Sequence, residues 1–170
     1  IEIARRLGAD GVVFGCLTAD GEVDLTSMQI LMEASKGLSV TFHRAFDVCR
    51  NPQKALEEII ELGCNRILTS GQQPTAEQGI GLLKELQGLA AGRITLLAGC
   101  GVNENNIARI AAETGINELH FSARESIQSE MKFRNEVVSM GGTVHINEYE
   151  RNVTSVRRVK ETVEALYKGM

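Results

Sequence analysis

The chain has 170 residues, 43% of them hydrophobic and 24% charged, and a net charge of −4. This composition is typical of one globular domain with a large core. The net negative charge does not indicate the clustered basic surface that binding to nucleic acid or an anionic membrane requires. No apolar run reaches the roughly 18 residues of a membrane span. The four cysteines lie far apart without a CxxC pair. We therefore expect neither a disulfide framework nor a zinc knuckle, but a reducing cytoplasmic setting.

Five short apolar runs recur along the chain, and each ends in small or polar residues. They end at Gly15, His43, Ser70, Gly99 and Ser122, so successive ends are 28, 27, 29 and 23 residues apart. That spacing is the length of one strand-plus-helix unit. Runs that are nearly continuous in apolar residues indicate strands of a parallel sheet with both faces buried. A closed (β/α)8 barrel needs eight units and about 250 residues. We therefore predict an α/β fold of the TIM-barrel type, here an incomplete barrel of about five parallel strands with outer helices.

The turns that lead into three of these strands are near copies of one another. Gly8, Gly63 and Gly115 each stand where a helix must end in a left-handed conformation, and an Asp or Asn follows two residues later. The segments between the runs predict the helices, over 23–36, 52–62, 75–89 and 103–113. The pair Asn51 and Pro52 supplies a cap and a proline at the first helical position.

After Arg124 the rhythm of the chain changes. Residues 126–154 are polar and contain glycine without any period, which predicts an irregular loop over the barrel top with no strand inside it. A helix over about 155–168 then closes the domain. We expect residues 1–170 to form one partial barrel whose strands start in the fourth unit of eight.

The carboxyl ends of the strands form the working face of such barrels. His43 stands at one of these ends, where an imidazole can act as a general acid or base or as a metal ligand. A histidine that is only packed inside the barrel is the alternative. Arg44 should point the other way and form a structural ion pair with Asp47.

A second candidate site follows the fourth and fifth runs. Gly99 and Gly101 let backbone N–H groups approach an anion, and a helix that starts near Asn103 adds its positive end. Ser122 and Arg124 would supply a hydroxyl and a guanidinium from the next loop. We predict that these five residues bind a phosphate-like anion. A glycine turn that is needed only for tight barrel closure is the alternative.

The cysteines suggest a third kind of site. Cys16 and Cys100 both follow strands, and soft thiolates suit Cu(I). Cys49 and Cys64 are expected to be small core residues. His120 is out of phase with Phe121 and is expected to point into the barrel.

The chain also resembles a known family. The segments GADGVVFGCLTADGEVD, VTFHRAFD, NPQKALEEIIELGCNRILTSG, GRITLLAGCGVNENNI, ELHFSAR and MKFRNEVVSMGG are similar to the CutC copper homeostasis family, in the right order and over almost the whole chain. The resemblance implies a (β/α) barrel, a role in copper tolerance or trafficking through Cu(I) binding, and a cytoplasmic location, with the nucleus as the alternative.

Three hypotheses of function follow. The first is a copper homeostasis protein that binds or handles Cu(I) in the cytoplasm. The second is a barrel enzyme that acts on a phosphorylated or carboxylated small molecule with His43 as acid or base, and the third is an interaction scaffold. Because a five-strand arc exposes two apolar strand edges, we expect either that more chain covers these edges or that the protein forms a homo-oligomer.

Overall fold

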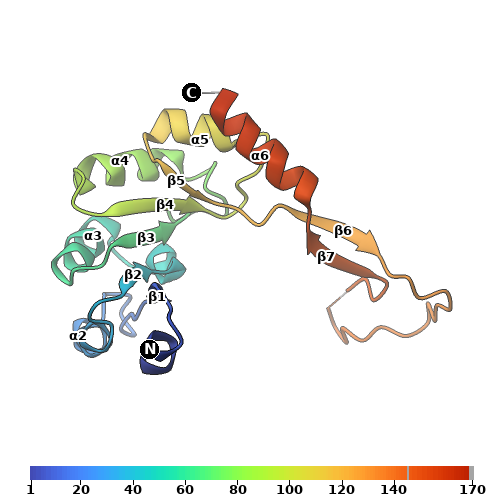
Figure 1. The fold of residues 1–170 in the computed structure, drawn as a ribbon, viewed down its shortest axis with the longest axis horizontal. Coiled ribbons are helices and arrows are strands. Elements are labelled where there is room, and N and C mark those ends of the chain that lie inside the picture. The colour runs from blue at the N-terminus through green and yellow to red at the C-terminus, as the bar shows by residue number, and fades with distance from the viewer. Residues whose placement is uncertain (145, 169–170) are drawn as a thin grey trace.

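The computed structural model describes residues 1–144 and 146–168. Its main feature is a parallel sheet in which five strands follow one another in chain order (Figure 1). The strands are β1 (Gly11–Phe14), β2 (Ser39–Phe42), β3 (Arg66–Thr69), β4 (Thr95–Gly99) and β5 (Glu118–His120). All four neighbouring pairs are parallel. The predicted α/β architecture, an incomplete TIM-type barrel, is confirmed.

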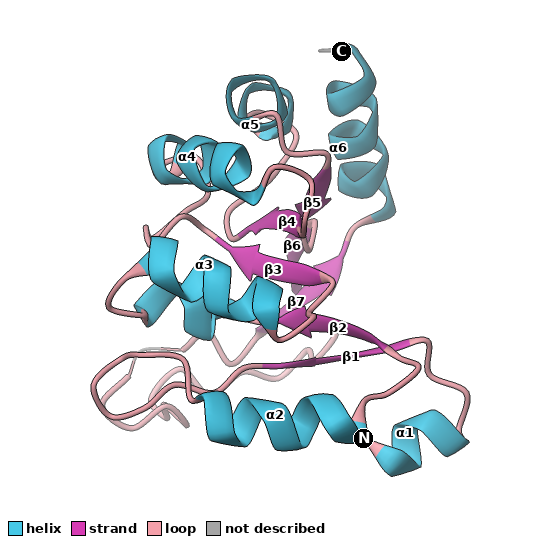
Figure 2. Cartoon of the chain, turned by 90° about the vertical axis from the view of Figure 1, so that its left-hand side faces the viewer, coloured by secondary structure: helices cyan, strands magenta, loops and turns pink. Residues whose placement is uncertain are grey.

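The helices lie around the outside of the strand arc (Figure 2). They are α1 (Glu2–Arg6), α2 (Leu25–Ala34), α3 (Pro52–Glu61), α4 (Ile80–Ala90), α5 (Ile107–Thr114) and α6 (Val156–Lys168), with a 3-10 helix η1 (Arg44–Val48) after β2. The Asn51 side chain caps α3 by accepting a hydrogen bond from the N–H of Lys54 at 3.0 Å, as its sequence predicts. Along the described residues, no helix is both long and apolar enough to cross a membrane.

Two helices begin later than the sequence predicts. Residues 76–79 form turns, because the N–H of Ala76 is bonded to the carbonyl of Cys100 at 2.9 Å. Residues 104–106 form turns as well, since the N–H of Asn103 donates to the Asn106 side chain at 2.8 Å. In both places, polar contacts within the strand-end loops replace the first helical turn. The predicted helix start at Asn103 is therefore wrong, and α5 begins at Ile107.

The core lies between the sheet and the helices. Val40, Phe42, Ile67 and Leu96 alternate along their strands and are at most 1% exposed. They pack with apolar helix residues, among which Leu56, Leu83 and Ile110 are completely buried. The alternate strand residues are only half-buried and several are polar, so the strands carry one fully buried face rather than two. The three predicted left-handed turns are present, with φ of +84°, +84° and +73° at Gly8, Gly63 and Gly115.

The segment after β5 departs from the prediction. β6 (Arg124–Gln128) and β7 (Glu150–Thr154) form a two-stranded antiparallel ribbon that projects away from the barrel body (Figure 1). The predicted irregular loop over 126–154 is thus wrong at both ends, and so is the expectation that no strand lies there. The strands of this ribbon carry one large apolar residue each, Ile127 and Val153, so apolar periodicity does not reveal them. Because the ribbon is a separate sheet, the five-strand sheet is unaffected.

Candidate functional site

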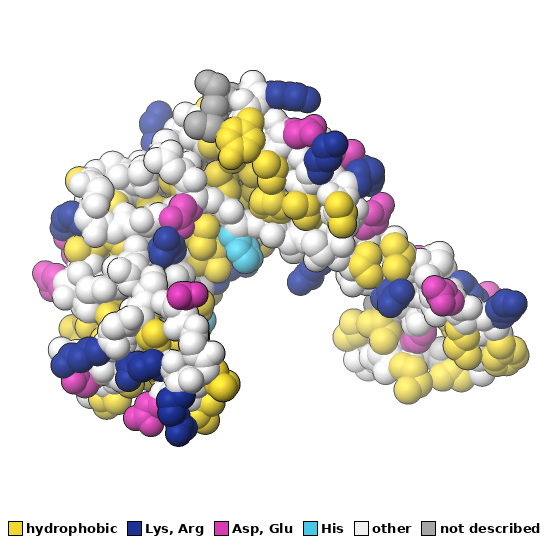
Figure 3. Space-filling model, in the orientation of Figure 1, with side chains coloured by type: hydrophobic (Ala, Val, Ile, Leu, Met, Phe, Trp, Pro, Cys, Tyr) yellow, Lys and Arg dark blue, Asp and Glu magenta, His cyan; other side chains and the backbone are white. Residues whose placement is uncertain are grey.

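A pocket of about 510 Å³ opens at the carboxyl ends of β3, β4 and β5. It brings together four of the five predicted anion-binding residues and Cys100. The lining residues are Arg44, Leu68, Cys100, Gly101, Val102, Asn103, His120, Phe121, Ser122, Ala123, Arg124 and Arg158. The surface is hollowed on this side, between the barrel body and the projecting ribbon (Figure 3).

Arg44 is the first cationic side chain of this pocket. Its Nε donates to Asp47 Oδ2 at 2.6 Å, so the predicted ion pair is confirmed. Its Nη2 donates to the hydroxyl of Ser70 at 3.1 Å. The expectation that Arg44 points away from the site is wrong, because the same side chain lines the pocket. The hydrogen bond that Arg44 donates to Asp47 raises the pKa of Arg44 above its already high usual value.

Asp47 is the anchor that fixes Arg44. The Asp47 side chain is 6% exposed. Its Oδ1 accepts from the Thr69 hydroxyl at 2.6 Å, from the N–H of Ser70 at 2.9 Å and from the N–H of Gln72 at 3.2 Å. This carboxylate therefore ties η1 to the end of β3 and holds one edge of the Arg44 guanidinium, which leaves the rest of that group at the pocket.

Four residues that line the pocket have backbone N–H groups without a hydrogen-bond partner among the described residues. Within the described residues, the N–H groups of Gly101, Val102, Ser122 and Ala123 donate no hydrogen bond. Gly101 has a φ of +72° and Ala123 a φ of +45°. A Cβ on Gly101 would lie 3.0 Å from Thr75 Cγ2, so a larger residue there is both strained and crowded. Unpaired N–H groups at a pocket are suited to an anion.

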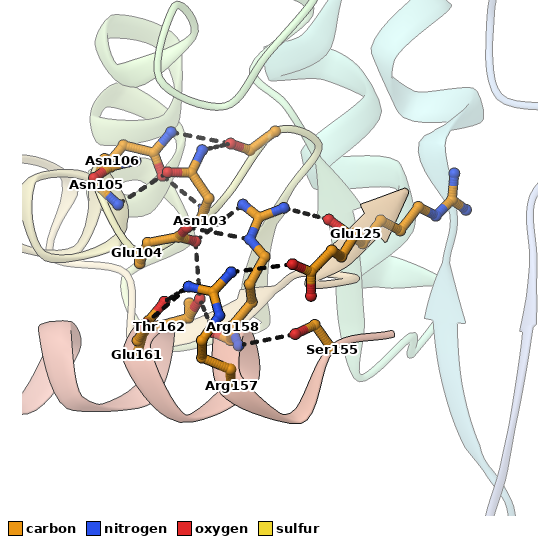
Figure 4. Close-up of polar contacts among 12 residues, drawn as sticks. Asn103, Glu104, Asn105, Asn106, Glu125, Ser155, Arg157, Arg158, Glu161 and Thr162 are labelled. Atoms are coloured by element: carbon orange, nitrogen blue, oxygen red, sulfur yellow. Dashed lines mark hydrogen bonds and ion pairs between the residues drawn. The ribbon is translucent and has the colours of Figure 1, made fainter. Parts of the chain in front are cut away.

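The other two predicted members of this site contribute less to it. Asn103 lines the pocket, but its Nδ2 donates to the carbonyl of Gly101 at 2.8 Å and its Oδ1 accepts from the N–H of Asn105 at 2.9 Å. Asn103 therefore shapes the loop, as Figure 4 shows. Gly99 is buried at the end of β4 and does not line the pocket; a Cβ there would lie 2.7 Å from Leu68 Cδ1. Close packing alone accounts for Gly99.

A polar latch, formed by Arg158 and Glu104, joins α6 to this loop. Arg158 Nε and Nη2 donate to the two oxygens of Glu104 at 3.1 and 3.0 Å. Arg158 Nη1 donates to the carbonyl of Arg124 (Figure 4). The hydrogen bond from Arg158 lowers the pKa of Glu104, and the same contact raises the pKa of Arg158. The latch thus places a third guanidinium at the pocket and fixes the start of β6.

The structure places the two candidate histidines differently. His43 caps η1, where its Nδ1 accepts a hydrogen bond from the N–H of Ala45 at 3.3 Å, and it is not among the residues that line the pocket. His120 ends β5 and does line it. A role of His43 in acid–base chemistry stays a prediction.

The four cysteines are all free. Cys49 and Cys64 are buried in the core as predicted, and burial raises the pKa of the Cys64 thiol to about 11. Cys100 lines the pocket, whereas Cys16 follows β1, three strand spacings or about 14 Å away along the sheet. In the described part of the chain, no three His, Cys, Asp or Glu side chains form a group that could hold a metal. Cu(I) binding by Cys16 and Cys100 stays a prediction.

The sequence profile of the CutC family matches residues 1–125. The chain belongs to the CutC family. It is 76% identical to a CutC family protein of Bacteroides thetaiotaomicron over 98% of this chain and 67% of that protein. It is 74% identical to one of Bacteroides fragilis, over 98% of this chain and 66% of that protein. The chain therefore spans about two thirds of the length of these curated relatives.

A solved CutC structure is also similar. The protein from Streptococcus agalactiae, provisionally described as a copper homeostasis protein, matches with a TM-score of 0.67 and 32% sequence identity. The match covers 70% of this chain and 59% of that one. This likeness supports the fold of parallel strands with flanking helices.

Sequence reasoning did not assign Arg44, His120 or Arg158 to the site of this CutC family member. The alternation of side-chain directions along β5 predicted that His120 points into the barrel, and this was the signal that could have assigned His120 to the site. No signal was available for Arg158, which lies on α6 beyond the residues that match the family profile.

Proposed function

We propose that this chain is part of a copper homeostasis protein and that its strand-end pocket binds a small anionic molecule, phosphorylated or carboxylated. The family membership and the description of the Streptococcus agalactiae protein support the first part. A cytoplasmic location accords with the four free cysteines, since disulfides are rare in reducing compartments.

One observation carries the anion-binding part of the proposal. Arg44, Arg124 and the four residues with unpaired N–H groups described above all line the same pocket. Arg44 is oriented by Asp47, while the side chain of Arg124 has no carboxylate partner within the described residues. Leu68 and Phe121 add apolar surface for the organic part of the ligand. Arginine with backbone donors is the usual means of recognising phosphate or carboxylate groups.

An NMR titration with inorganic phosphate tests this proposal. The amide resonances of Gly101, Val102, Ser122 and Ala123 should shift with one common saturation curve. A titration with sodium chloride at matched ionic strength serves as the control. Shifts that are spread evenly over the protein, or that sodium chloride reproduces, would contradict the proposal.

His43 is our candidate for acid–base chemistry on such a ligand. Because its Nδ1 accepts from the N–H of Ala45, the neutral ring carries its proton on Nε2. A His43→Gln variant that keeps its phosphate affinity but loses turnover of a phosphorylated substrate supports this role. Turnover equal to that of the unchanged protein would remove His43 from the mechanism.

Direct Cu(I) handling is the second candidate function, and the position of Cys100 favours it. This half-buried thiol lines the pocket together with Arg44, and its Sγ donates to the carbonyl of Pro74 at 3.1 Å. Thiolate is the ligand that Cu(I) prefers. With Cys16 as the other proposed ligand, copper binding would require the two loops to approach each other.

A further inference from the structure

The strand-end pocket is lined by positive charge without negative charge. Arg44, Arg124 and Arg158 line it, and among the described residues no aspartate or glutamate does. Asp47 and Glu104, which pair with two of these arginines, lie outside the lining. The three arginines come from η1, from the start of β6 and from α6, so they reach the pocket from different sides. Positive groups that approach from different sides suit a ligand with more than one anionic group.

The guanidinium of Arg44 lies at the carboxyl end of β3 and keeps one edge free. Its Nε donates to Asp47 Oδ2 at 2.6 Å, and its Nη2 donates to the hydroxyl of Ser70, the residue after β3, at 3.1 Å. Nη1 donates to no nitrogen or oxygen atom of the described residues. The edge formed by Nη1 and Nη2 is therefore available to a ligand. Two N–H donors in one plane match the two oxygens of a carboxylate.

The unpaired backbone donors belong to the loops after β4 and β5. They are the N–H groups of Gly101 and Val102 in the first loop and of Ser122 and Ala123 in the second. Donors from two loops can approach one group from several directions, and Arg124 adds a guanidinium from the second loop. A phosphate has three outer oxygens in a tetrahedral arrangement, so it accepts more of these hydrogen bonds than a planar carboxylate does. This part of the pocket therefore favours phosphate.

The two parts of the pocket are one to two strand spacings apart. Because β3, β4 and β5 are neighbours in the sheet, the end of β3 lies about 5–10 Å from the ends of the other two strands. Leu68 and Phe121 supply apolar surface within the same pocket. Each donor reaches its acceptor over about 2.9 Å, so a chain of two or three atoms between two acidic groups spans the remaining distance.

We propose that the ligand of this pocket carries both a phosphate group and a carboxylate, at opposite ends of a short chain. The inference rests on the proposed anion site and adds a second, separate contact. The phosphate binds at the loops after β4 and β5, and the carboxylate binds the free edge of Arg44. A pocket of about 510 Å³ has room for a molecule of this kind. Asp47 then acts as a positioning residue, because it holds the Arg44 guanidinium with that edge free.

Calorimetry of the full-length protein with two matched phosphate esters tests the inference. Phosphoglycolate and ethyl phosphate have the same head group and the same number of carbon atoms, but only phosphoglycolate ends in a carboxylate. We expect phosphoglycolate to bind about tenfold more tightly, as a charge-assisted pair with Arg44 requires. In Arg44→Gln this preference should fall to about twofold or less, since only long-range attraction by the other cations remains. Arg44→Lys keeps the charge without the paired donors and should also lose most of the preference.

Arg109→Gln is the control, because Arg109 lies on α5 outside the pocket and its loss should leave the preference intact. If inorganic phosphate and ethyl phosphate bind but the carboxylate brings no gain, this inference is wrong and the proposed anion site stands. If none of the phosphates binds, both are wrong. A preference that survives in Arg44→Gln and Arg44→Lys, or tighter binding of ethylene glycol bisphosphate than of phosphoglycolate, would also overturn the inference.

Discussion

Arg124→Ala should weaken the binding of inorganic phosphate by about tenfold. The substitution removes a guanidinium that lines the pocket and that no carboxylate of the described residues neutralises. A hydrogen bond to a charged group contributes about 1.5–3 kcal/mol. Because Arg124 is exposed, we take the lower end of that range, and ~1.5 kcal/mol corresponds to about a factor of ten in the dissociation constant.

Isothermal titration calorimetry at pH 7 measures this change, and Arg109→Ala is the matched control. Arg109 lies on α5 outside the pocket and pairs with Glu113 at 2.7 Å. Its replacement changes the net charge by the same amount, but screening at physiological salt limits the long-range effect to about twofold or less. If the two variants bind phosphate equally, Arg124 does not contact the anion and the assignment of the pocket fails.

Three further predictions concern the thiols and the latch. Cys16→Ser and Cys100→Ser should each lower the affinity for Cu(I), measured in competition with a chromogenic chelator, whereas Cys49→Ser should leave it unchanged. Because a direct ligand is lost, the decrease should exceed the 10–100-fold that is typical when a residue supporting a ligand is replaced. Equal Cu(I) binding by all three variants would contradict this. Iodoacetamide at pH 8 should label Cys16 and Cys100 before Cys49, because burial raises the pKa of the Cys49 thiol. Mass spectrometry measures the order of labelling, and the reverse order would refute this prediction. Arg158 lowers the pKa of Glu104, so the latch stabilises the fold above the unfolded-state pKa of about 4.3 and is lost as pH falls through the lower folded-state pKa. Thermal melts should show Glu104→Gln less stable at pH 7 and less sensitive to acid, and parallel profiles for both proteins would contradict the latch.

The parallel sheet could be predicted because strand-plus-helix units repeat at a nearly constant spacing. The turns at Gly8, Gly63 and Gly115 gave independent support, since their left-handed conformation is encoded locally. Helix starts failed at residues 75 and 103, where side chains and a neighbouring loop bind the backbone. Such contacts depend on the folded structure, so local sequence does not encode them.

The pocket could be predicted only in part. Ser122 and Arg124 follow the strand next to the one that precedes Gly101, and adjacent parallel strands end at one edge. The sequence predicted only that Arg44 forms an ion pair with Asp47. That Arg44 also lines the pocket depends on how Asp47 anchors η1 to β3. Arg158 reaches the pocket only because a polar ribbon returns the chain to α6, and the sequence pattern does not reveal that ribbon.

The central claim, an anion site at the strand ends, is tested most directly by a crystal structure of the full-length protein with bound inorganic phosphate. The account predicts phosphate density within hydrogen-bond distance of the N–H groups of Gly101 and Val102 and of the Arg124 guanidinium. Phosphate bound elsewhere, with this pocket holding water alone at a concentration that saturates the protein in calorimetry, would contradict it.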